Sequence, residues 1–415
     1  MQLSFLLPIM VTAVGFFLLV KLRFFFILHP IKTAREFTSA LKDREARRSF
    51  FLALAGTLGV GNIFGVSAGI MIGGAGSLFW LFISSLFSAI IKYAEILLAF
   101  DADKKEGGMA AVLSSVFHKK GGFLSYLFAC LTVALSLFMG AAMQSAAVCD
   151  IAVESIDLMP HVTALILVFL LLPALLGDAK KIENITEIII PLTTIIYIII
   201  SICVIIANFQ KLPDTFFKVI SSAASPSAIT GGVATLAIKE GFARGILSNE
   251  AGTGTSAMAH QRAADRSPHI AGLFGMCEVF FDTTLLCTLT GLTILLSVPS
   301  ISAYSTPMAL VFAAFHSSLG KLGGLLLPLI FSFAYATLIC WFYYGKEYSR
   351  LYLGRLDRFF PFAFILFTLT SYIIPSSLLL YFTDLILLFM TFLTLSAIVK
   401  KSSRIAELAL KKPEL

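Results

Sequence analysis

The chain has 415 residues, of which 58% are hydrophobic and only 13% are charged, and its formal net charge is +7. Soluble domains carry roughly twice this share of charged residues, so the composition excludes an assembly of soluble domains. Apolar runs such as 162–176, 188–207 and 378–399 approach or reach the ~20 residues that cross ~30 Å of hydrocarbon. We therefore expect an all-α polytopic membrane protein, because a transmembrane barrel would show short alternating segments instead.

Hydropathy predicts about eleven transmembrane helices. They are expected near residues 3–28, 50–72, 77–100, 122–149, 162–177, 186–208, 229–256, 270–298, 322–345, 359–375 and 379–399. The first of them, within 1–28, lacks a charged n-region and a small-residue cleavage site. It is therefore expected to be a retained helix and not a removed signal peptide.

The distribution of basic residues predicts the topology. Of the 31 Lys and Arg residues, 25 fall in loops that the eleven-helix arrangement puts on one side, and only Lys211, Lys218 and Lys321 fall on the other. The positive-inside rule then predicts an N-terminus outside and a C-terminus in the cytoplasm. The net charge reflects this bias and gives no indication of a nucleic-acid partner.

The same charge count requires a crossing between residues 209 and 269, where no clean apolar helix is found. The only candidate is 229–262, which is rich in Gly, Ala, Ser and Thr and also carries charges. A segment this polar cannot face lipid, because its backbone and charges would lack partners there. We expect it to be surrounded by protein or to line a watery cavity.

Two glycine-rich interruptions occupy corresponding places. Without the N-terminal helix, residues 56–62 lie in the first remaining helix and 248–255 in the sixth. Such a pair points to an inverted-repeat transporter with its site near the midplane. Gly61, Gly65, Gly69 and Gly73 are also four residues apart, which is typical of helix packing. We interpret the last three as packing residues and the cluster around 56–59 as unwound backbone.

Five runs resemble the alanine or glycine:cation symporters of bacteria and archaea. They are AGTLGVGNIFGVSAG (55–69), FWLFISSLFSAIIKYAEILLA (79–99), GFARGILSNEAGTGTSAMAH (241–260), FFDTTLLCTLT (280–290) and FAYATLICWFYYGKE (333–347). The resemblance implies a LeuT-like fold of two inverted five-helix repeats with discontinuous first and sixth helices. It also implies uptake of small neutral amino acids, usually driven by Na⁺, in a bacterial cytoplasmic membrane.

On this basis the chain divides into six parts. We expect an extra N-terminal helix, a basic amphipathic cytoplasmic segment, a first five-helix repeat, an external segment, a second five-helix repeat and a basic cytoplasmic tail. Their respective bounds are 1–28, 29–49, 50–208, 209–228, 229–399 and 400–415.

Glu250 is the leading candidate for substrate binding. An acid at membrane depth in a broken helix is a functional hypothesis by default, and the resemblance implies that it binds the substrate ammonium. The alternative is a structural ion pair with Arg244 or Lys239. The other residues expected to line this break are Ile246, Asn249, Gly252, Gly254 and Thr255.

The first break is expected to bind the substrate carboxylate through backbone N–H groups, as helix N-termini do. The residues concerned are Gly59, Val60 and Gly61, with Asn62 serving either the carboxylate or an ion. Gln144, Thr337 and Trp341 match family positions beside the substrate. For Gln144 the alternative is a buried amide satisfied by a neighbouring helix, and for Trp341 it is plain core packing.

A Na⁺ site is expected at freed carbonyls of the first break. The resemblance implies the carbonyls of Ala55 and Leu58 together with the hydroxyl of Thr337, and such hard oxygen ligands suit Na⁺. Asp282 is a further intramembrane acid that either contacts an ion or braces the helices. Lys92 and Glu95 are expected near the cytoplasmic end of their helix, where they would snorkel or pair.

The resulting hypothesis is a secondary active transporter that takes up alanine, glycine or a similarly small amino acid with Na⁺ by alternating access, without an organic cofactor. Val60 and Ala336 replace hydroxyl residues that the family usually has near the ion. A proton-coupled or exchange carrier, with Glu250 or Asp282 taking the proton, is therefore kept as the alternative. The oligomeric state is left open, and a monomer is compatible with the sequence.

An enzyme and a channel are disfavoured. The sequence has no H-E-x-x-H motif, and its G-x-S-x-G run, GVSAG (65–69), falls inside a predicted membrane helix and not on the strand-to-helix turn that this motif requires. It also has no charge rings or repeated filter sequence of the kind that line channels. Four histidines are expected near helix ends or in loops, away from the carboxylates: His118, His161, His260 and His269.

Overall fold

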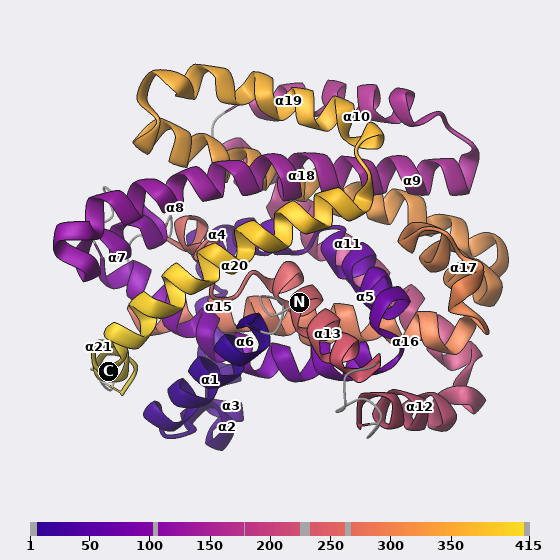
Figure 1. The fold of residues 1–415 in the computed structure, drawn as a ribbon, viewed down its shortest axis with the longest axis horizontal. Coiled ribbons are helices and arrows are strands. Elements are labelled where there is room, and N and C mark those ends of the chain that lie inside the picture. Colours follow the sequence, from indigo (N-terminus) through magenta and orange to yellow (C-terminus); the bar gives the residue numbers. More distant parts are fainter. Residues whose placement is uncertain (1–5, 103–106, 178, 225–232, 262–266, 411–415) are drawn as a thin grey trace.

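The structure, a computed structural model, describes residues 6–102, 107–177, 179–224, 233–261 and 267–410, and these ranges form helices and no strand (Figure 1). Among the described residues, seven helical segments are long and apolar enough to cross a membrane, and the bent pair Arg44–Thr57 and Gly61–Gly73 would be an eighth. Two shorter apolar helices accompany them. The all-α polytopic architecture is confirmed, while the count of eleven helices stays a prediction.

The helices follow one another with short connections. The first group is α1 (Leu6–Lys21), α2 (Phe25–Leu28), α3 (Pro30–Ala40), α4 (Arg44–Thr57), η2 (Gly61–Gly65), α5 (Val66–Gly73) and α6 (Gly76–Asp101). The second is α7 (Gly108–Phe117), η3 (His118–Lys120), α8 (Gly121–Leu135), η4 (Ser136–Met143), α9 (Gln144–Ile156), α10 (Pro160–Leu175) and α11 (Ala179–Ala207).

The second half of the chain continues in the same manner. It begins with η5 (Phe209–Lys211), α12 (Leu212–Ala224), α13 (Val233–Asn249), α14 (Ala257–His260), α15 (Pro268–Val279), η7 (Phe280–Cys287) and α16 (Thr288–Ser297). It ends with η8 (Ile301–Ala303), α17 (Pro307–Leu319), η9 (Gly320–Leu325), α18 (Leu326–Tyr352), η10 (Gly354–Phe359), α19 (Phe360–Thr370), η11 (Ser371–Ile373), α20 (Ser376–Lys400) and α21 (Ser402–Leu410).

Both predicted interruptions are present. α4 begins after Asp43, whose carboxylate caps the helix by accepting from the N–H of Ala46 at 2.9 Å. It ends at Thr57, and the chain resumes at Gly61 with a bend of 44°. In the second half, α13 ends at Asn249 and α14 begins at Ala257. The second break lies in the predicted cluster. The first lies at 58–60, so Gly59 is unwound as predicted, whereas the prediction for Gly56 is wrong because α4 extends through Thr57.

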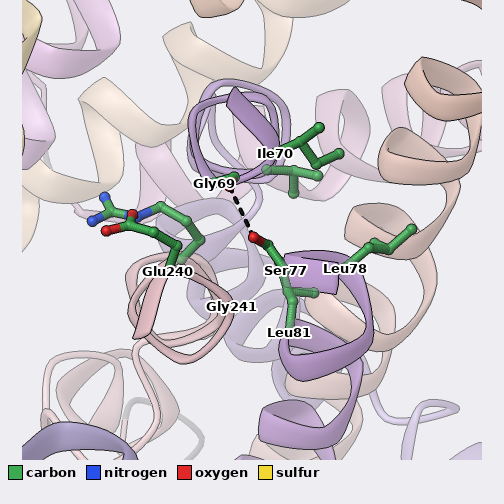
Figure 2. A pocket seen from close by; sticks show the side chains of 9 residues that line it. Gly69, Ile70, Ser77, Leu78, Leu81, Glu240 and Gly241 are labelled. Carbon is green, nitrogen blue, oxygen red and sulfur yellow. Dashed lines mark hydrogen bonds and ion pairs between the residues drawn. The ribbon is translucent and has the colours of Figure 1, made fainter. Parts of the chain in front are cut away.

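A stripe of glycines packs the segment after the first break against α13. A methyl group on Gly65, Gly69 or Gly73 would lie 3.4, 2.9 or 3.0 Å from atoms of α13. Figure 2 shows Gly69 beside Ser77 of α6 and near Gly241 of α13, and the Ser77 hydroxyl donates to the Gly69 carbonyl at 3.0 Å. The interpretation of these three glycines as packing residues is confirmed.

Segments that were predicted to share a side of the membrane lie at the same end of the molecule. Figure 1 shows α7 and α21 at one end and α12 and α17 at the other. Arg404 of α21 forms an ion pair of 2.7 Å with Asp101 at the end of α6. At the opposite end, the Asn208 amide donates to Ser318 of α17 at 2.9 Å. The relative sidedness of these segments agrees with the charge count.

Parts of several predicted segments lie outside the described residues: 1–5, 103–106, 178, 225–232, 262–266 and 411–415. The division into two five-helix repeats and the bounds of the six predicted parts stay predictions.

Candidate functional site

The first break is held by side chains of α18. The Thr337 hydroxyl donates to the Ala55 carbonyl at 2.8 Å, and Trp341 Nε1 donates to the Gly56 carbonyl at 3.1 Å. Carbonyls in the last turn of a helix have no partner within the helix. These two side chains therefore donate hydrogen bonds to two carbonyls that the interruption of the helix leaves unpaired. Both predicted neighbours of the substrate thus contact the first break.

Gln144 reaches the same break from the start of α9. Its Oε1 accepts from the Val60 N–H at 3.0 Å, while its Nε2 donates to the Met139 carbonyl at 3.3 Å. Gly59 allows this approach, because a methyl group there would lie 2.7 Å from both Gln144 Oε1 and Thr337 Oγ1. The structure therefore brings Gly59, Val60, Gln144 and Thr337 together.

The second break owes its shape to left-handed backbone. φ is +52° at Glu250, +79° at Gly252 and +85° at Gly254. Two of these positions suit glycine, whereas a non-glycine residue in this conformation is strained and tends to be found at functional sites. The strain at Glu250 thus coincides with the leading candidate residue.

The Glu250 side chain is fully buried. Its Oε2 accepts from the Thr255 hydroxyl, and its Oε1 has no hydrogen-bond partner among the described residues. The alternative pairing with Arg244 is wrong, since Arg244 forms ion pairs with Asp384 at 2.5 Å and with Glu240 at 3.3 Å. Lys239 also pairs with Glu240, at 3.7 Å. One oxygen of this buried carboxylate therefore has no hydrogen-bond partner among the described residues.

Two charged residues of α6 support the second break from the side. Lys92 Nζ donates to the carbonyls of Asn249 and Glu250 at 3.2 and 3.4 Å. One turn further, Glu95 Oε2 accepts from the Gly252 N–H at 2.7 Å. A cation thus lies at the C-terminal end of α13, where the helix dipole favours positive charge. Both side chains are fully buried, so Lys92 does not snorkel. The pairing alternative is confirmed, because Lys92 Nζ lies 3.9 Å from Glu95 Oε1.

Glu278 and His260 complete this charged cluster. Glu278 Oε1 lies 3.4 Å from Lys92 Nζ, and Glu278 Oε2 lies 2.8 Å from His260 Nε2. All three side chains are at most 1% exposed. The expectation that His260 lies away from the carboxylates is therefore wrong. It failed because α14 continues past the second break and carries His260 back against α15.

Asp282 connects the two breaks. Its Oδ1 accepts from the Asn62 amide at 2.5 Å, and its Oδ2 accepts from the hydroxyls of Ser248 and Thr283, each at 2.6 Å. Asn62 follows the first break and Ser248 precedes the second. The bracing interpretation of Asp282 is supported by these contacts, and a contact with an ion stays a prediction.

Other predicted residues are placed around the breaks. Ile246 is fully buried, and the Asn249 amide donates to Thr283 at 3.0 Å. A methyl group on Gly61 would lie 3.7 Å from the Leu247 carbonyl oxygen, so the start of η2 contacts the end of α13. Gly252 and Gly254 face other helices: methyl groups there would meet side chains such as Ile91 of α6 and Met109 of α7 at 3.3 and 2.6 Å.

Comparison with known proteins identifies the family. Residues 1–411 match the sodium:alanine symporter family. The chain belongs to this family. It is 34% identical over 310 residues to an uncharacterized transporter of Haemophilus influenzae, an alignment that covers 71% of this chain and 67% of the relative. It is 31% identical over 334 residues to the sodium/alanine symporter AgcS of Methanococcus maripaludis, covering 77% and 73%.

A third relative is the putative sodium/proton-dependent alanine carrier protein YrbD of Bacillus subtilis, which is 30% identical over 335 residues, covering 76% of this chain and 69% of the relative. The sodium:alanine symporter family consists of transporters and not of enzymes. The chain is therefore a multi-pass membrane transporter.

In this member of the sodium:alanine symporter family, the predicted oxygen ligands for a cation are partly assembled. Ala55 and Thr337 supply two oxygens that lie 2.8 Å apart. Val60 and Ala336, which replace expected hydroxyl residues, are fully buried. The region therefore contains two oxygens of the kind that suit a hard cation, and the cation site stays a prediction.

Sequence reasoning missed the roles of Lys92, Glu95, Glu278 and His260. A signal for the first two was present. Ser84, Ser88, Lys92 and Glu95 recur at helical spacing on one face of α6, and all four are fully buried. A polar stripe on a membrane helix indicates a face turned toward protein or a cavity and not toward lipid.

Proposed function

We propose that this transporter takes up a small neutral amino acid such as alanine or glycine together with Na⁺ by alternating access. The observation that carries the proposal is the unpaired Oε1 of Glu250. A buried carboxylate oxygen without a partner is costly, and the ammonium group of an amino acid is a partner of matching charge and hydrogen-bonding capacity.

The first break supports a position for the other end of the substrate. The helix that resumes at Gly61 presents the positive end of its dipole and its first N–H groups there, and both favour a carboxylate. Since Gly61 contacts the end of α13, this helix start and the second break lie close together, which supports a short zwitterion as the ligand of both. The bulky Trp341 and Ile246, both fully buried, would restrict the substrate to a small side chain.

For the coupling ion, Na⁺ is supported by the paired oxygens of Ala55 and Thr337 and by family membership. A proton-coupled or exchange carrier is the second candidate, because Val60 and Ala336 leave the proposed Na⁺ site with fewer hydroxyls. For orientation, the 25 basic residues on one side support an N-terminus outside and a C-terminus in the cytoplasm, in a bacterial cytoplasmic membrane.

Uptake of labelled alanine and glycine into proteoliposomes tests the function. We expect an inward Na⁺ gradient alone to drive uptake and a proton gradient alone to fail; the reverse result would favour the second candidate. No uptake of either amino acid under both gradients would contradict the proposal as a whole.

The variant Glu250→Gln tests the assigned residue in the same vesicles. It keeps a hydrogen-bonding side chain but removes the charge that attracts the ammonium. Loss of one partner of a buried charge pair costs several kcal/mol of binding free energy, so we expect uptake to fall by about 100-fold or more. Glu240→Gln is the matched control. It removes a buried acid of α13, the helix that ends just before Glu250, and this acid pairs with Arg244. The variant should leave measurable Na⁺-driven uptake. Normal uptake by Glu250→Gln would contradict the assignment.

A further inference from the structure

The region behind the second break carries an excess of buried negative charge. Four carboxylates and one lysine, all fully buried, lie around it. They are Glu95, Glu250, Glu278, Asp282 and Lys92. Among the described residues, these four carboxyl groups, if all were ionised, would face one ammonium group and leave three negative charges uncompensated. Charge at membrane depth is costly unless it is paired, so this region requires bound protons or cations.

His260 is placed to supply one of these positive charges. Its Nε2 lies 2.8 Å from Glu278 Oε2, and the ring is 1% exposed. Its Nδ1 has no hydrogen-bond partner among the described residues, so this nitrogen is the position where a second ring proton would be carried. Within the described part of the cluster, Lys92 and His260 are the two groups that can hold positive charge.

Lys92 links this pair to the break. Its Nζ lies 3.4 Å from Glu278 Oε1 and also donates to the carbonyls of Asn249 and Glu250. A cation that binds at Glu250 therefore repels the Lys92 ammonium, which in turn contacts Glu278 beside His260. Water does not screen these charges, because the groups are buried.

Several other groups face the pair from the surrounding helices. Ser256 of the second break donates to Glu278 Oε2 at 3.3 Å. The titratable and charged groups are Lys92 and Glu95 from α6, Glu250 from the break, Asp282 from η7, and Tyr344 and Cys340 from α18.

We propose that His260 and Glu278 form a proton-binding site whose occupancy is linked to the loading of the second break. The pair holds a proton, as an imidazolium beside a carboxylate, while the break is empty. It releases that proton to water, leaving a neutral imidazole, when Na⁺ and the substrate ammonium bring positive charge to the break. The identity of these ligands rests on the proposed function; the protonated pair itself does not.

Proton release on binding tests this linkage. The purified full chain in weakly buffered detergent solution, with a pH-indicator dye, receives Na⁺ alone, alanine alone, or both. At neutral pH the wild type is expected to release about one proton per chain when both are added. His260→Gln keeps an amide that can donate to Glu278 but cannot take up a proton, so its release should fall to the level of the blank. Glu278→Gln removes the partner charge and should lose release as well.

Two controls separate this site from other sources of protons. His316→Gln removes a histidine that stacks on Phe312 in α17 and should leave release unchanged. Arg262→Gln changes a basic residue in the segment 262–266, which lies outside the described residues. If Arg262→Gln abolishes release and His260→Gln does not, the compensating charge comes from elsewhere and the proposal is wrong.

A measurement without any ligand tests the protonated pair directly. In ¹⁵N-histidine NMR spectra of the substrate-free protein at neutral pH, the signals lost in His260→Gln identify His260. We expect both ring nitrogens to be protonated, and a bare ring nitrogen would contradict the proposal. If alanine and Na⁺ bind without proton release, the linkage is wrong and the proposed function stands. If no amino acid binds but the imidazolium is present, the proton site stands and the proposed function fails.

Discussion

The two helix breaks are held in different ways. The first is held by neutral hydrogen bonds from α9 and α18, which Gln144, Thr337 and Trp341 make to its backbone. The second is held by two charged side chains of α6. Lys92 donates to its carbonyls, and Glu95 accepts from one of its N–H groups. The backbone of the first break is thus held in place by neutral polar groups, which form a neutral cradle. The second break is surrounded by charged groups, which form a charged centre whose electrostatic balance changes when a cation binds.

This difference suggests a division of work between the breaks. A neutral cradle can bind a carboxylate end without changing its own charge, so it suits orientation and selection by size. A charged centre changes its electrostatic balance when an ammonium or Na⁺ arrives, so it suits coupling. Asp282 joins the two through Asn62 and Ser248, which gives a physical route by which loading of one break affects the other.

The largest effect is expected from Lys92→Met. This change leaves Glu278 buried without its ammonium partner and removes the donor from two carbonyls, and breaking a buried ion pair costs about 3–5 kcal/mol. We expect loss of the folded protein at moderate temperature, measured by size-exclusion chromatography after heating. Lys239→Met, which removes a partly exposed lysine of α13, is the control. Equal thermal stability of the two variants would show that the second break does not depend on Lys92.

Asp282→Ala tests the connection between the breaks. The Asn62 amide and the hydroxyls of Ser248 and Thr283 would lose their acceptor, at a cost of about 2–3 kcal/mol for buried donors left unpaired. Asp282→Asn keeps an acceptor oxygen and should restore most of this stability. If Asp282 only braces the helices, the Na⁺ concentration that gives half-maximal uptake should be the same in Asp282→Asn as in the wild type. A large rise in that concentration would instead assign Asp282 to the ion.

A smaller effect is expected at the first break from Trp341→Phe. The Gly56 carbonyl loses one hydrogen bond, which costs about 1 kcal/mol, and the smaller ring leaves room for a larger substrate. Competition of alanine uptake by valine or leucine should therefore strengthen. Trp80→Phe is the matched control, because the only other tryptophan donates to Ala223 at 3.3 Å, away from the breaks. Unchanged selectivity in Trp341→Phe would contradict a size-limiting role.

The positions of the two breaks could be predicted from the sequence. Clusters of Gly, Ser and Thr in otherwise apolar segments indicate backbone that is not fully helical, and the charge count required a crossing between residues 209 and 269. The contact of Thr337 with the first break was anticipated through family resemblance, which for Trp341 implied only a position beside the substrate. Spacing alone does not say which residue of α18 faces α4.

The charged support of the second break could not be predicted in the same way. Hydropathy assigns Lys92 and Glu95 to the end of a membrane helix, where exposure to water is the usual outcome. Their burial depends on how α6 packs against α13 and α15, which is a tertiary property. The same holds for His260, whose neighbour Glu278 lies 18 residues away in the sequence and approaches it only because α14 returns against α15.

Binding of labelled alanine to the purified protein in the presence of Na⁺ tests the central claim most directly, because it isolates the ammonium–carboxylate contact from the transport cycle. The wild type is expected to bind saturably, and Glu250→Gln is expected to bind at least about 100-fold more weakly, corresponding to a loss of about 2.7 kcal/mol. Equal affinity of the wild type and of folded Glu250→Gln would contradict the claim that the second break binds the substrate through Glu250.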